Sequence, residues 1–259
     1  MTQQQTYSFG GFGIPVDLLC LTGGGPDTFD AISKQHIAHI EKHIGISASD
    51  SIVEIGCGIG RDAIPLTSIL EDKGRYVGID IIRPSIEWCT ENITARHQNF
   101  SFHWFNVADK LHNPGGDLPI SACRIPADEE SVDLIILQSV FTHMFEDGIL
   151  FYLKEFARVM KRRAKIYATC FIVDEVTLAA VSNAPVTIYS LSFLHHYQDG
   201  CYINSIDYPT GAVAFTLPKL HEMINAAGLR FSRPALRGTW SGVYPDADGG
   251  QDTIILEKM

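Results

Sequence analysis

Three glycines at alternate positions mark the first stretch of the chain whose residues could do chemistry. They lie in V-E-I-G-C-G-I-G-R-D-A, residues 53–63, behind an apolar pair and a carboxylate, Glu54. Glycine lets the chain turn sharply off a strand and lets backbone approach a ligand without a Cβ in the way. A helix that follows directs its N–H groups at that ligand. The stretch predicts a nucleotide-like cofactor, but glycine spacing alone does not say which one.

Two cofactors compete for this loop. Residues 58–63 satisfy G-x-G-x-x-A, a form of the dinucleotide fingerprint, and Asp80 ends a second apolar strand, as the ribose-binding carboxylate of NAD enzymes does. Glu54 disfavours a dinucleotide, because a dinucleotide site usually has an aliphatic residue at this position. A buried carboxylate is costly unless paired, and a cationic sulfonium amino acid would pair it. The Y-x-x-x-K pair of short-chain dehydrogenases is absent, since no tyrosine has a lysine four positions later.

The elements that must position these residues alternate through the central part of the chain. Apolar runs predict strands at 51–55, 76–79, 100–107, 132–138 and 165–171, with helices at 61–71, 84–96 and 149–161. Such alternation indicates βαβ units and a parallel sheet. A helix is predicted at 28–44, and a further helix at 217–227 precedes strands at 229–237 and 253–257. Residues 174–216 are rich in aromatics and are interpreted as an insertion over the carboxyl edge of the sheet, where open α/β sheets bind ligands.

A series of motifs follows the glycine loop at regular intervals. V-E-I-G-C-G-I-G, V-G-I-D, W-F-N-V and S-V-D-L-I-I-L-Q-S-V-F-T-H-M together resemble class I S-adenosylmethionine-dependent methyltransferases over about residues 51–173. The resemblance implies an α/β fold with a seven-stranded, mostly parallel sheet, helices on both faces and an antiparallel last strand. It implies a single methyltransferase domain, 1–259, made of an N-terminal helical cap (1–50), a cofactor-binding core (51–173), a substrate-covering insertion after the fifth strand (174–216) and a C-terminal helix and strand pair (217–259).

The same resemblance assigns the cofactor, S-adenosyl-L-methionine, to particular residues. Arg61 would pair with its carboxylate, with a surface salt bridge as the alternative. Asp80 would hold the ribose, with Ile81 packing on the adenine. Asn106, with Val107 beside it, would recognise the adenine amino group, and its alternative is a plain turn residue. The methionine part would be bound by Glu54, Gly56, Cys57, Gly58, Gly60, Gln138 and Ser139.

Candidate catalysts follow from the chemistry of methyl transfer. Positioning is the main requirement, but a hydroxyl acceptor must also lose a proton, and histidine is the usual agent near neutral pH. His143 follows the fourth predicted strand and is the leading candidate; a backbone-bonded histidine at a helix start is the alternative. His195 and His196, in the aromatic insertion, come next. His36, His39 and His43 could line one helical face, but they lack a nearby carboxylate cluster, so packing or helix-surface roles are predicted for them. Metal-dependent methyltransferases usually have an aspartate at the end of the fourth strand, where this chain has Gln138, so we predict no metal.

Composition limits the partners and the compartment. The formal charge of −10 disfavours nucleic acid and anionic membranes, and residues 137–141, L-Q-S-V-F, lack the motifs of DNA-base methyltransferases. Six scattered cysteines without C-x-x-C, and an N-terminus without a signal-peptide pattern, predict a cytoplasmic protein. The motifs S-V-F-T-H-M and G-T-W-S-G are similar to those of bacterial methyltransferases for small molecules or sugars.

O-methylation of a small molecule or glycan is therefore the function that the sequence favours. An NAD(P)-dependent oxidoreductase and an inactive cofactor-binding partner subunit are the alternatives, and a homodimer is left open.

Overall fold

The computed structural model describes residues 5–110, 112–183 and 190–259. The chain divides into two compact units: unit 1 runs to residue 126 and includes 132–134, and unit 2 comprises 127–131 and 135–259. Seven strands form one sheet in the order β12-β13-β7-β6-β3-β4-β5. The predicted seven-stranded α/β fold is confirmed. No helix within the described part of the chain is long and apolar enough to cross a bilayer.

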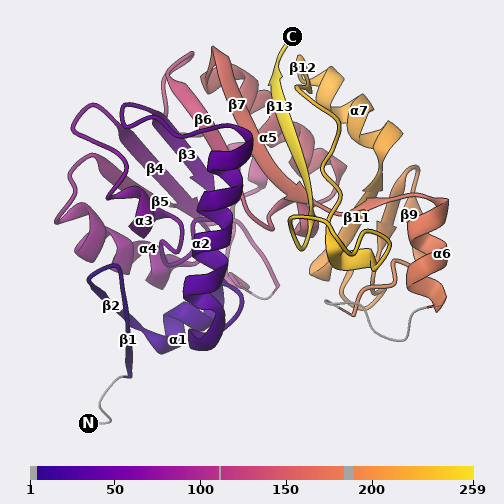
Figure 1. Cartoon of the computed structure of the whole chain (residues 1–259), viewed down its shortest axis with the longest axis horizontal. Coiled ribbons are helices and arrows are strands. Elements are labelled where there is room, and N and C mark those ends of the chain that lie inside the picture. Colours follow the sequence, from indigo (N-terminus) through magenta and orange to yellow (C-terminus); the bar gives the residue numbers. More distant parts are fainter. Residues whose placement is uncertain (1–4, 111, 184–189) are drawn as a thin grey trace. The chain divides into compact units, whose positions relative to one another are not determined.

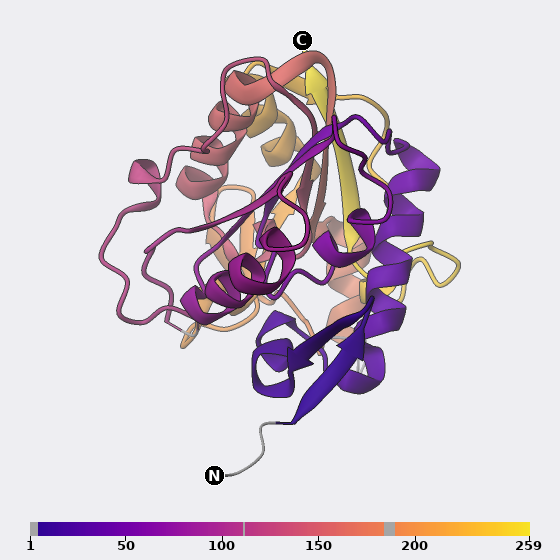
Figure 2. The ribbon, with the colours of Figure 1, turned by 90° about the vertical axis from the view of Figure 1, so that its left-hand side faces the viewer.

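Unit 1 begins with a β-hairpin that the sequence analysis did not predict. Strands β1 (Thr6–Phe9) and β2 (Phe12–Pro15) pair antiparallel, joined by Gly10 and Gly11, both at positive φ. The hairpin lies beside α1 (Val16–Leu19), the 3-10 turn η1 (Cys20–Thr22) and the long helix α2 (Pro26–His43) (Figure 2). Phe9 packs edge-on against the buried ring of Phe29 in α2, with ring centroids 5.2 Å apart. Tyr7 also packs edge-on against Phe29 (6.2 Å) and donates a hydrogen bond to Asp30 Oδ1 (2.8 Å), so aromatic and polar contacts together hold the hairpin on α2.

The strands of unit 1 are parallel, as the alternation predicts. β3 (Ser51–Ile55) pairs with β4 (Arg75–Asp80), which pairs with β5 (Phe100–Trp104). The side chain of Asp133 accepts a hydrogen bond from the Ser51 amide at the start of β3 (3.0 Å). β6 (Val132–Leu137) has residues in both units.

Two predicted helices of unit 1 are shorter than their apolar spacing suggests. The helix predicted at 61–71 is only α3 (Ala63–Leu66), because Thr67 donates its hydroxyl to the Ile64 carbonyl (2.7 Å) and closes the chain into turns. The helix predicted at 84–96 is α4 (Arg83–Cys89), followed by a π-helical turn, η2 (Thr90–Thr94). After β5, a 3-10 turn at Ile120–Ala122 (η3) is the last helical element of the unit.

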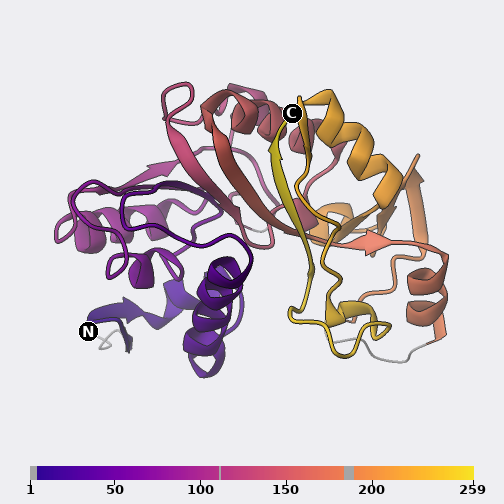
Figure 3. The same cartoon turned by 45° about the horizontal axis from the view of Figure 1, so that its top comes forward.

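Unit 2 carries the antiparallel edge of the sheet. β13 (Asp252–Lys258) pairs antiparallel with both β7 (Met160–Cys170) and β12 (Leu229–Phe231), and Figure 3 shows β13 running along β7. The antiparallel last strand is thus confirmed. α5 (Glu146–Val159) precedes β7 and α7 (Leu217–Ala226) precedes β12. The strand predicted at 229–237 is wrong beyond Phe231, since Pro234 cannot donate to a ladder.

The segment 174–216 is a folded layer with its own sheet, drawn in orange in Figure 1. Helix α6 (Glu175–Asn183) is followed by β9 (His195–Gln198), β10 (Cys201–Ile203), the turn η5 (Pro209–Gly211) and β11 (Val213–Thr216). With β8 (Ile172–Val173), these strands form a four-stranded sheet in the order β8-β11-β10-β9.

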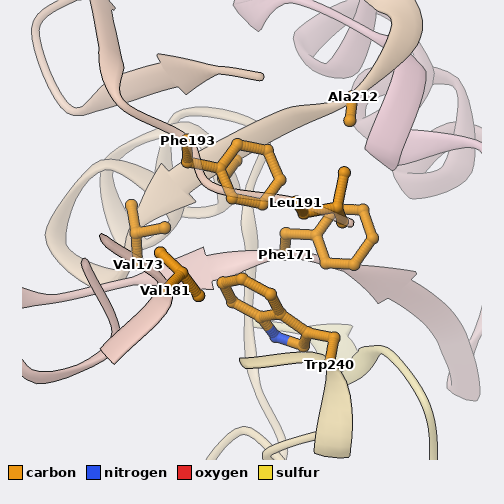
Figure 4. Close-up of a cluster of buried hydrophobic side chains, with 8 residues drawn as sticks. Phe171, Val173, Val181, Leu191, Phe193, Ala212 and Trp240 are labelled. Atoms are coloured by element: carbon orange, nitrogen blue, oxygen red, sulfur yellow. The ribbon is translucent and has the colours of Figure 1, made fainter. Parts of the chain in front are cut away.

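Several aromatics of this segment form a hydrophobic core. Phe193 packs against Phe171 and Trp240, with ring centroids 5.3 and 5.4 Å away, and all three rings are buried. Figure 4 shows the cluster, whose members are Phe171, Val173, Val181, Leu191, Phe193, Ala212, Ala214 and Trp240. Phe215 is buried as well, and Tyr189 lies outside the described residues. Packing, the alternative to ring stacking on a substrate, therefore accounts for Phe193 and Phe215.

A buried carboxylate explains the G-T-W-S-G motif. Asp252 is fully buried and accepts hydrogen bonds from Trp240 Nε1 (2.8 Å), from the Gly238 amide (2.8 Å) and from the Ile172 amide (2.7 Å). Arg237 Nε lies 3.3 Å from its Oδ1. Burial raises the pKa of Asp252, while Arg237 and the donors oppose that rise. The carboxylate, at the start of β13, ties the turn η6 (Thr239–Ser241) to the start of β8.

Asp252→Asn is expected to lower the free energy of unfolding by about 1–3 kcal/mol. The amide group of asparagine would bring its own N–H donors against the N–H donors that Asp252 now accepts from. Arg237 would keep only Asp174, whose Oδ2 lies 3.7 Å from its Nη2, as a counter-charge. Urea denaturation measures the loss. The control is Arg83→Gln, because the Arg83–Glu87 pair is 62% and 56% exposed and should contribute roughly 0.5 kcal/mol or less. Equal losses in the two variants would contradict this account.

Candidate functional site

The glycine loop after β3 has the backbone conformation that only glycine adopts easily. Gly56, Gly58 and Gly60 have φ values of 78°, 52° and 78°. A Cβ on Gly58 would lie 2.6 Å from the side chain of Thr22, and one on Gly60 would lie 2.7 Å from Ile93 Cδ1. Positive φ therefore favours glycine at all three positions, and the close approach of Thr22 and Ile93 excludes larger residues at Gly58 and Gly60.

Asp80 fastens this loop to the end of β4. Its Oδ2 accepts a hydrogen bond from the Gly58 amide (2.7 Å), and its Oδ1 accepts one from the Ile82 amide (2.8 Å). Burial raises the pKa of Asp80, and the amides of Ile82 and Gly58 oppose the rise. Each carboxylate oxygen keeps a further lone pair, which is the acceptor that a ribose hydroxyl needs. The position fits the predicted role, and Ile81 follows directly, with its carbonyl bonded to Trp104 Nε1 (2.9 Å).

Glu54 is buried in β3 and has a partner that the sequence analysis missed. The Tyr76 hydroxyl, on the neighbouring strand β4, donates a hydrogen bond to Glu54 Oε2. Burial raises the pKa of Glu54 well above its usual value, and the nearby Asp62 adds to the rise. Tyr76 and Arg61 act in the opposite direction. A cationic ligand near the loop would likewise favour the charged carboxylate, so the environment fits a sulfonium cofactor; direct contact stays a prediction.

Arg61 binds the N-terminal segment in this structure. Its Nη1 donates to the Gly23 carbonyl (2.9 Å), and its own carbonyl accepts from Ser33 in α2 (2.8 Å). The Ile59 amide donates to Thr22 Oγ1 (3.1 Å), so two neighbouring residues of the loop hold residues 22–23. Arg61 Nε is buried without a hydrogen-bond partner among the described residues. Its pairing with a cofactor carboxylate stays a prediction.

His36, the first of the three spaced histidines, contacts the glycine loop. Its Nδ1 lies 2.7 Å from Oδ2 of the buried Asp62. Asp62 Oδ1, also buried, has no hydrogen-bond partner in the described part of the chain. The rings of His39 and His43 pack edge-on, with centroids 4.4 Å apart. The predicted alternative, a packing or surface role, describes His36 better than a metal ligand does.

Asn106 closes the loop after β5. Its Nδ2 donates to Asp117 Oδ1 (2.7 Å), and its Oδ1 accepts from Asn113 Nδ2 (3.1 Å). Val107 forms a β-bridge with Leu118. Asn106 therefore has the turn role given above as its alternative. Because Oδ1 keeps a second lone pair, recognition of an adenine amino group is compatible with it and stays a prediction.

The turn after β6 holds the remaining predicted residues in unit 2. Gln138 is 9% exposed, and its Nε2 is buried without a hydrogen-bond partner among the residues described. Ser139 has a positive φ of 60° and donates its amide to Thr169 Oγ1 (2.7 Å). An orphaned amide donor next to a strained residue is the arrangement expected where a ligand completes the hydrogen bonds.

His143, in the 3-10 turn η4 (Phe141–His143), is oriented by the insertion. Its Nδ1 lies 2.9 Å from the carbonyl oxygen of Thr210 in η5. A carbonyl only accepts, so Nδ1 carries the proton and Nε2 of the neutral ring carries the basic lone pair. No sequence pattern pointed to Thr210 as the partner of His143, because the two residues are 67 positions apart.

His195 and His196 lie on β9, where adjacent side chains point to opposite faces. The His196 ring is exposed and packs edge-on against Tyr202, with centroids 5.2 Å apart. His195 pairs in register with Ile203 of β10. Their catalytic roles stay predictions. Among bonds within the described residues, His143 is the one of the three whose ring bonds a backbone carbonyl.

The comparisons with known proteins agree with this geometry. A family model described as "Methyltransferase domain" matches residues 53–168. Mitomycin 7-O-methyltransferase is 15% identical, with a TM-score of 0.57, over 91% of this chain and 55% of its own. The chain thus spans about half the length of that protein.

Two further solved structures share the fold. The Burkholderia thailandensis 1,6-didemethyltoxoflavin-N1-methyltransferase is 17% identical, with a TM-score of 0.54, over 89% of this chain and 79% of its own. The geranyl diphosphate C-methyltransferase of Streptomyces coelicolor A3(2) is 10% identical, with a TM-score of 0.56. The match covers 88% of this chain and 81% of that protein. At these identities the likeness to solved structures shows the fold alone.

Proposed function

We propose that this chain, a class I S-adenosylmethionine-dependent methyltransferase, transfers its methyl group to a hydroxyl oxygen of a small molecule, with His143 as general base. The observation that carries the proposal is the hydrogen bond from His143 Nδ1 to the Thr210 carbonyl (2.9 Å). It fixes the ring and leaves Nε2 as the base, which an oxygen acceptor needs.

The residues around the glycine loop would bind the cofactor. When bound, S-adenosylmethionine supplies a methyl carbon that the positive sulfur already activates. The free lone pairs of Asp80 would accept from the ribose hydroxyls, and the carboxylate of Glu54 would favour the positive charge. The positive-φ glycines allow backbone to approach the ligand closely.

His143 would remove the acceptor's proton. A hydroxyl becomes an ether only if its O–H bond breaks, and Nε2 would receive that proton as the oxygen forms its bond to carbon. The Nδ1–H bond to Thr210 then holds the resulting imidazolium in place. Amines that are already neutral need less help of this kind, so the oriented histidine favours an oxygen acceptor.

An aromatic pair, half-buried Phe145 and exposed Tyr197, supports a small ring or sugar as the acceptor. Phe145, two residues after His143, stacks on Tyr197 of β9 with centroids 4.6 Å apart and planes 12° from parallel. Tyr197 is 49% exposed. Such a face packs against aromatic or carbohydrate rings. The acidic charge of −10 argues for the same class over nucleic acid. The six free thiols support a cytoplasmic location.

The test is a labelled-methyl screen with the purified protein. Acceptors in four classes (phenols, sugar hydroxyls, amines and carboxylic acids) are incubated with methyl-labelled S-adenosylmethionine, and the products are treated with alkali. We expect alkali-stable label in hydroxyl acceptors, because ethers survive where esters hydrolyse. Label confined to nitrogen or carbon would contradict O-methylation. Titration calorimetry with S-adenosylmethionine and with NAD, run in parallel, should give heat for the first only.

A further inference from the structure

Ser139 holds a backbone conformation that serine adopts only at a cost. Its φ of 60° lies in the left-handed region, which is uncommon for residues other than glycine. Such strain persists where the surroundings over-determine the conformation, and it concentrates at ligand sites. The contacts that hold Ser139 therefore indicate which of its hydrogen-bonding atoms is left for a ligand.

Three side chains of unit 2 fix Ser139. Thr169 Oγ1, in β7, accepts the Ser139 amide (2.7 Å). Gln251 Nε2, just before β13, donates to Ser139 Oγ (2.9 Å) across 112 residues of sequence. Thr142 Oγ1 donates to the Ser139 carbonyl (2.9 Å) and lies 3.2 Å from Ser139 Oγ. Backbone and side chain of Ser139 are thus both held.

The donors and acceptors in these hydrogen bonds can be assigned, and they leave Ser139 Oγ able to accept one more hydrogen bond. The one proton of Thr142 is used on the Ser139 carbonyl, so Thr142 Oγ1 accepts the proton of Ser139 Oγ. The amide nitrogen of Gln251 can only donate, and it takes one lone pair of Ser139 Oγ. One lone pair of Ser139 Oγ is left. A ligand group that meets it must be an N–H or O–H donor.

We propose that Gln251 is a positioning residue that acts through Ser139. It fixes Ser139 Oγ so that the remaining lone pair accepts a hydrogen bond from the α-ammonium group of S-adenosylmethionine. This inference rests on the proposed placement of Ser139 at the methionine end of the cofactor. It does not depend on the acceptor.

A double-mutant cycle on cofactor affinity tests it. By calorimetry, Ser139→Ala is expected to weaken S-adenosylmethionine binding roughly 10-fold and Gln251→Leu about 5-fold, as the loss or misplacement of one charge-assisted hydrogen bond does. The double variant should bind no more weakly than Ser139→Ala, because Gln251 has no effect without the hydroxyl. Unchanged affinity in Ser139→Ala, or a double variant whose losses multiply, would overturn the proposal.

Matched variants separate positioning from folding. Gln98→Leu makes the same change at an exposed turn of unit 1 and should bind the cofactor as the wild type does. If Gln251→Leu fails to fold, Gln251→Met replaces it in the cycle with the same expectations, because methionine has an unbranched side chain about as long as that of glutamine.

The strain has a readout of its own. Ser139→Gly and Ser139→Ala lose the same hydroxyl and should lose the same affinity, but glycine relieves the left-handed conformation. The melting temperature of Ser139→Gly is therefore expected to exceed that of Ser139→Ala by about 2–4 °C. A glycine variant that melts below the alanine variant would contradict the strain. If the wild-type protein binds S-adenosylmethionine but methylates no hydroxyl, the proposed acceptor is wrong. The double-mutant cycle would still test the role of Gln251, because it measures cofactor affinity alone.

Discussion

Asp80→Ala is expected to weaken S-adenosylmethionine binding by about 10²–10⁴-fold. Two hydrogen bonds from ribose hydroxyls to an ionised group are worth roughly 1.5–3 kcal/mol each, and about 1.4 kcal/mol is tenfold in affinity. The substitution also removes the acceptor that holds the Gly58 and Ile82 amides (2.7 and 2.8 Å), so the glycine loop would lose its fastening to β4. Titration calorimetry at neutral pH measures the change.

Two companion variants show whether the carboxylate itself is responsible. Asp80→Asn keeps one acceptor oxygen and the side-chain shape, so its affinity should fall between those of wild type and Asp80→Ala. Asp72→Ala removes an exposed carboxylate of the same unit and should leave affinity unchanged. Wild-type affinity in a folded Asp80→Ala protein would remove Asp80 from the cofactor site.

His143→Ala is expected to lower kcat by about 10²–10⁴-fold, the usual contribution of a general base, and to leave S-adenosylmethionine affinity nearly unchanged. The separation is expected because His143 Nδ1 bonds the Thr210 carbonyl of the insertion, whereas other residues are proposed to bind the cofactor. Single-turnover rates with a hydroxyl acceptor from the labelled-methyl screen provide the measurement. Added imidazole should restore part of the rate, since it supplies the missing base.

The matched control is His221→Ala. His221 is exposed on α7 and packs on Phe231, with centroids 4.4 Å apart, so its removal should leave kcat unchanged. Normal turnover in His143→Ala would assign His143 the alternative role of a backbone-bonded histidine. A loss of cofactor affinity as large as the loss of kcat would show that the turn, not the base, had been disturbed.

Local pattern predicted the strands of the sheet better than the helices around it. The strand at 51–55 has the predicted bounds, and the one predicted at 132–138 ends one residue earlier, because a continuous apolar run in a buried strand has few other uses. The helix predicted at 61–71 failed because a threonine hydroxyl competed for a backbone carbonyl. The β1–β2 hairpin was missed although Tyr7 and Phe9, and then Phe12 and Ile14, alternate with polar or small residues, because each strand has only four residues.

The sequence by itself determined the chemistry of the cofactor loop. Positive-φ glycines and an aspartate at the next strand's end are local requirements, so residue type and spacing reveal them, and the resemblance to methyltransferases followed from the order of the motifs. The hydrogen-bond partners of the site residues came only from the tertiary structure. Tyr76 bonds Glu54, Thr210 bonds His143 and Gln251 bonds Ser139. These pairs are 22, 67 and 112 residues apart. They meet because strand order and the folding of the insertion bring distant segments together, and no local pattern encodes a strand's neighbour.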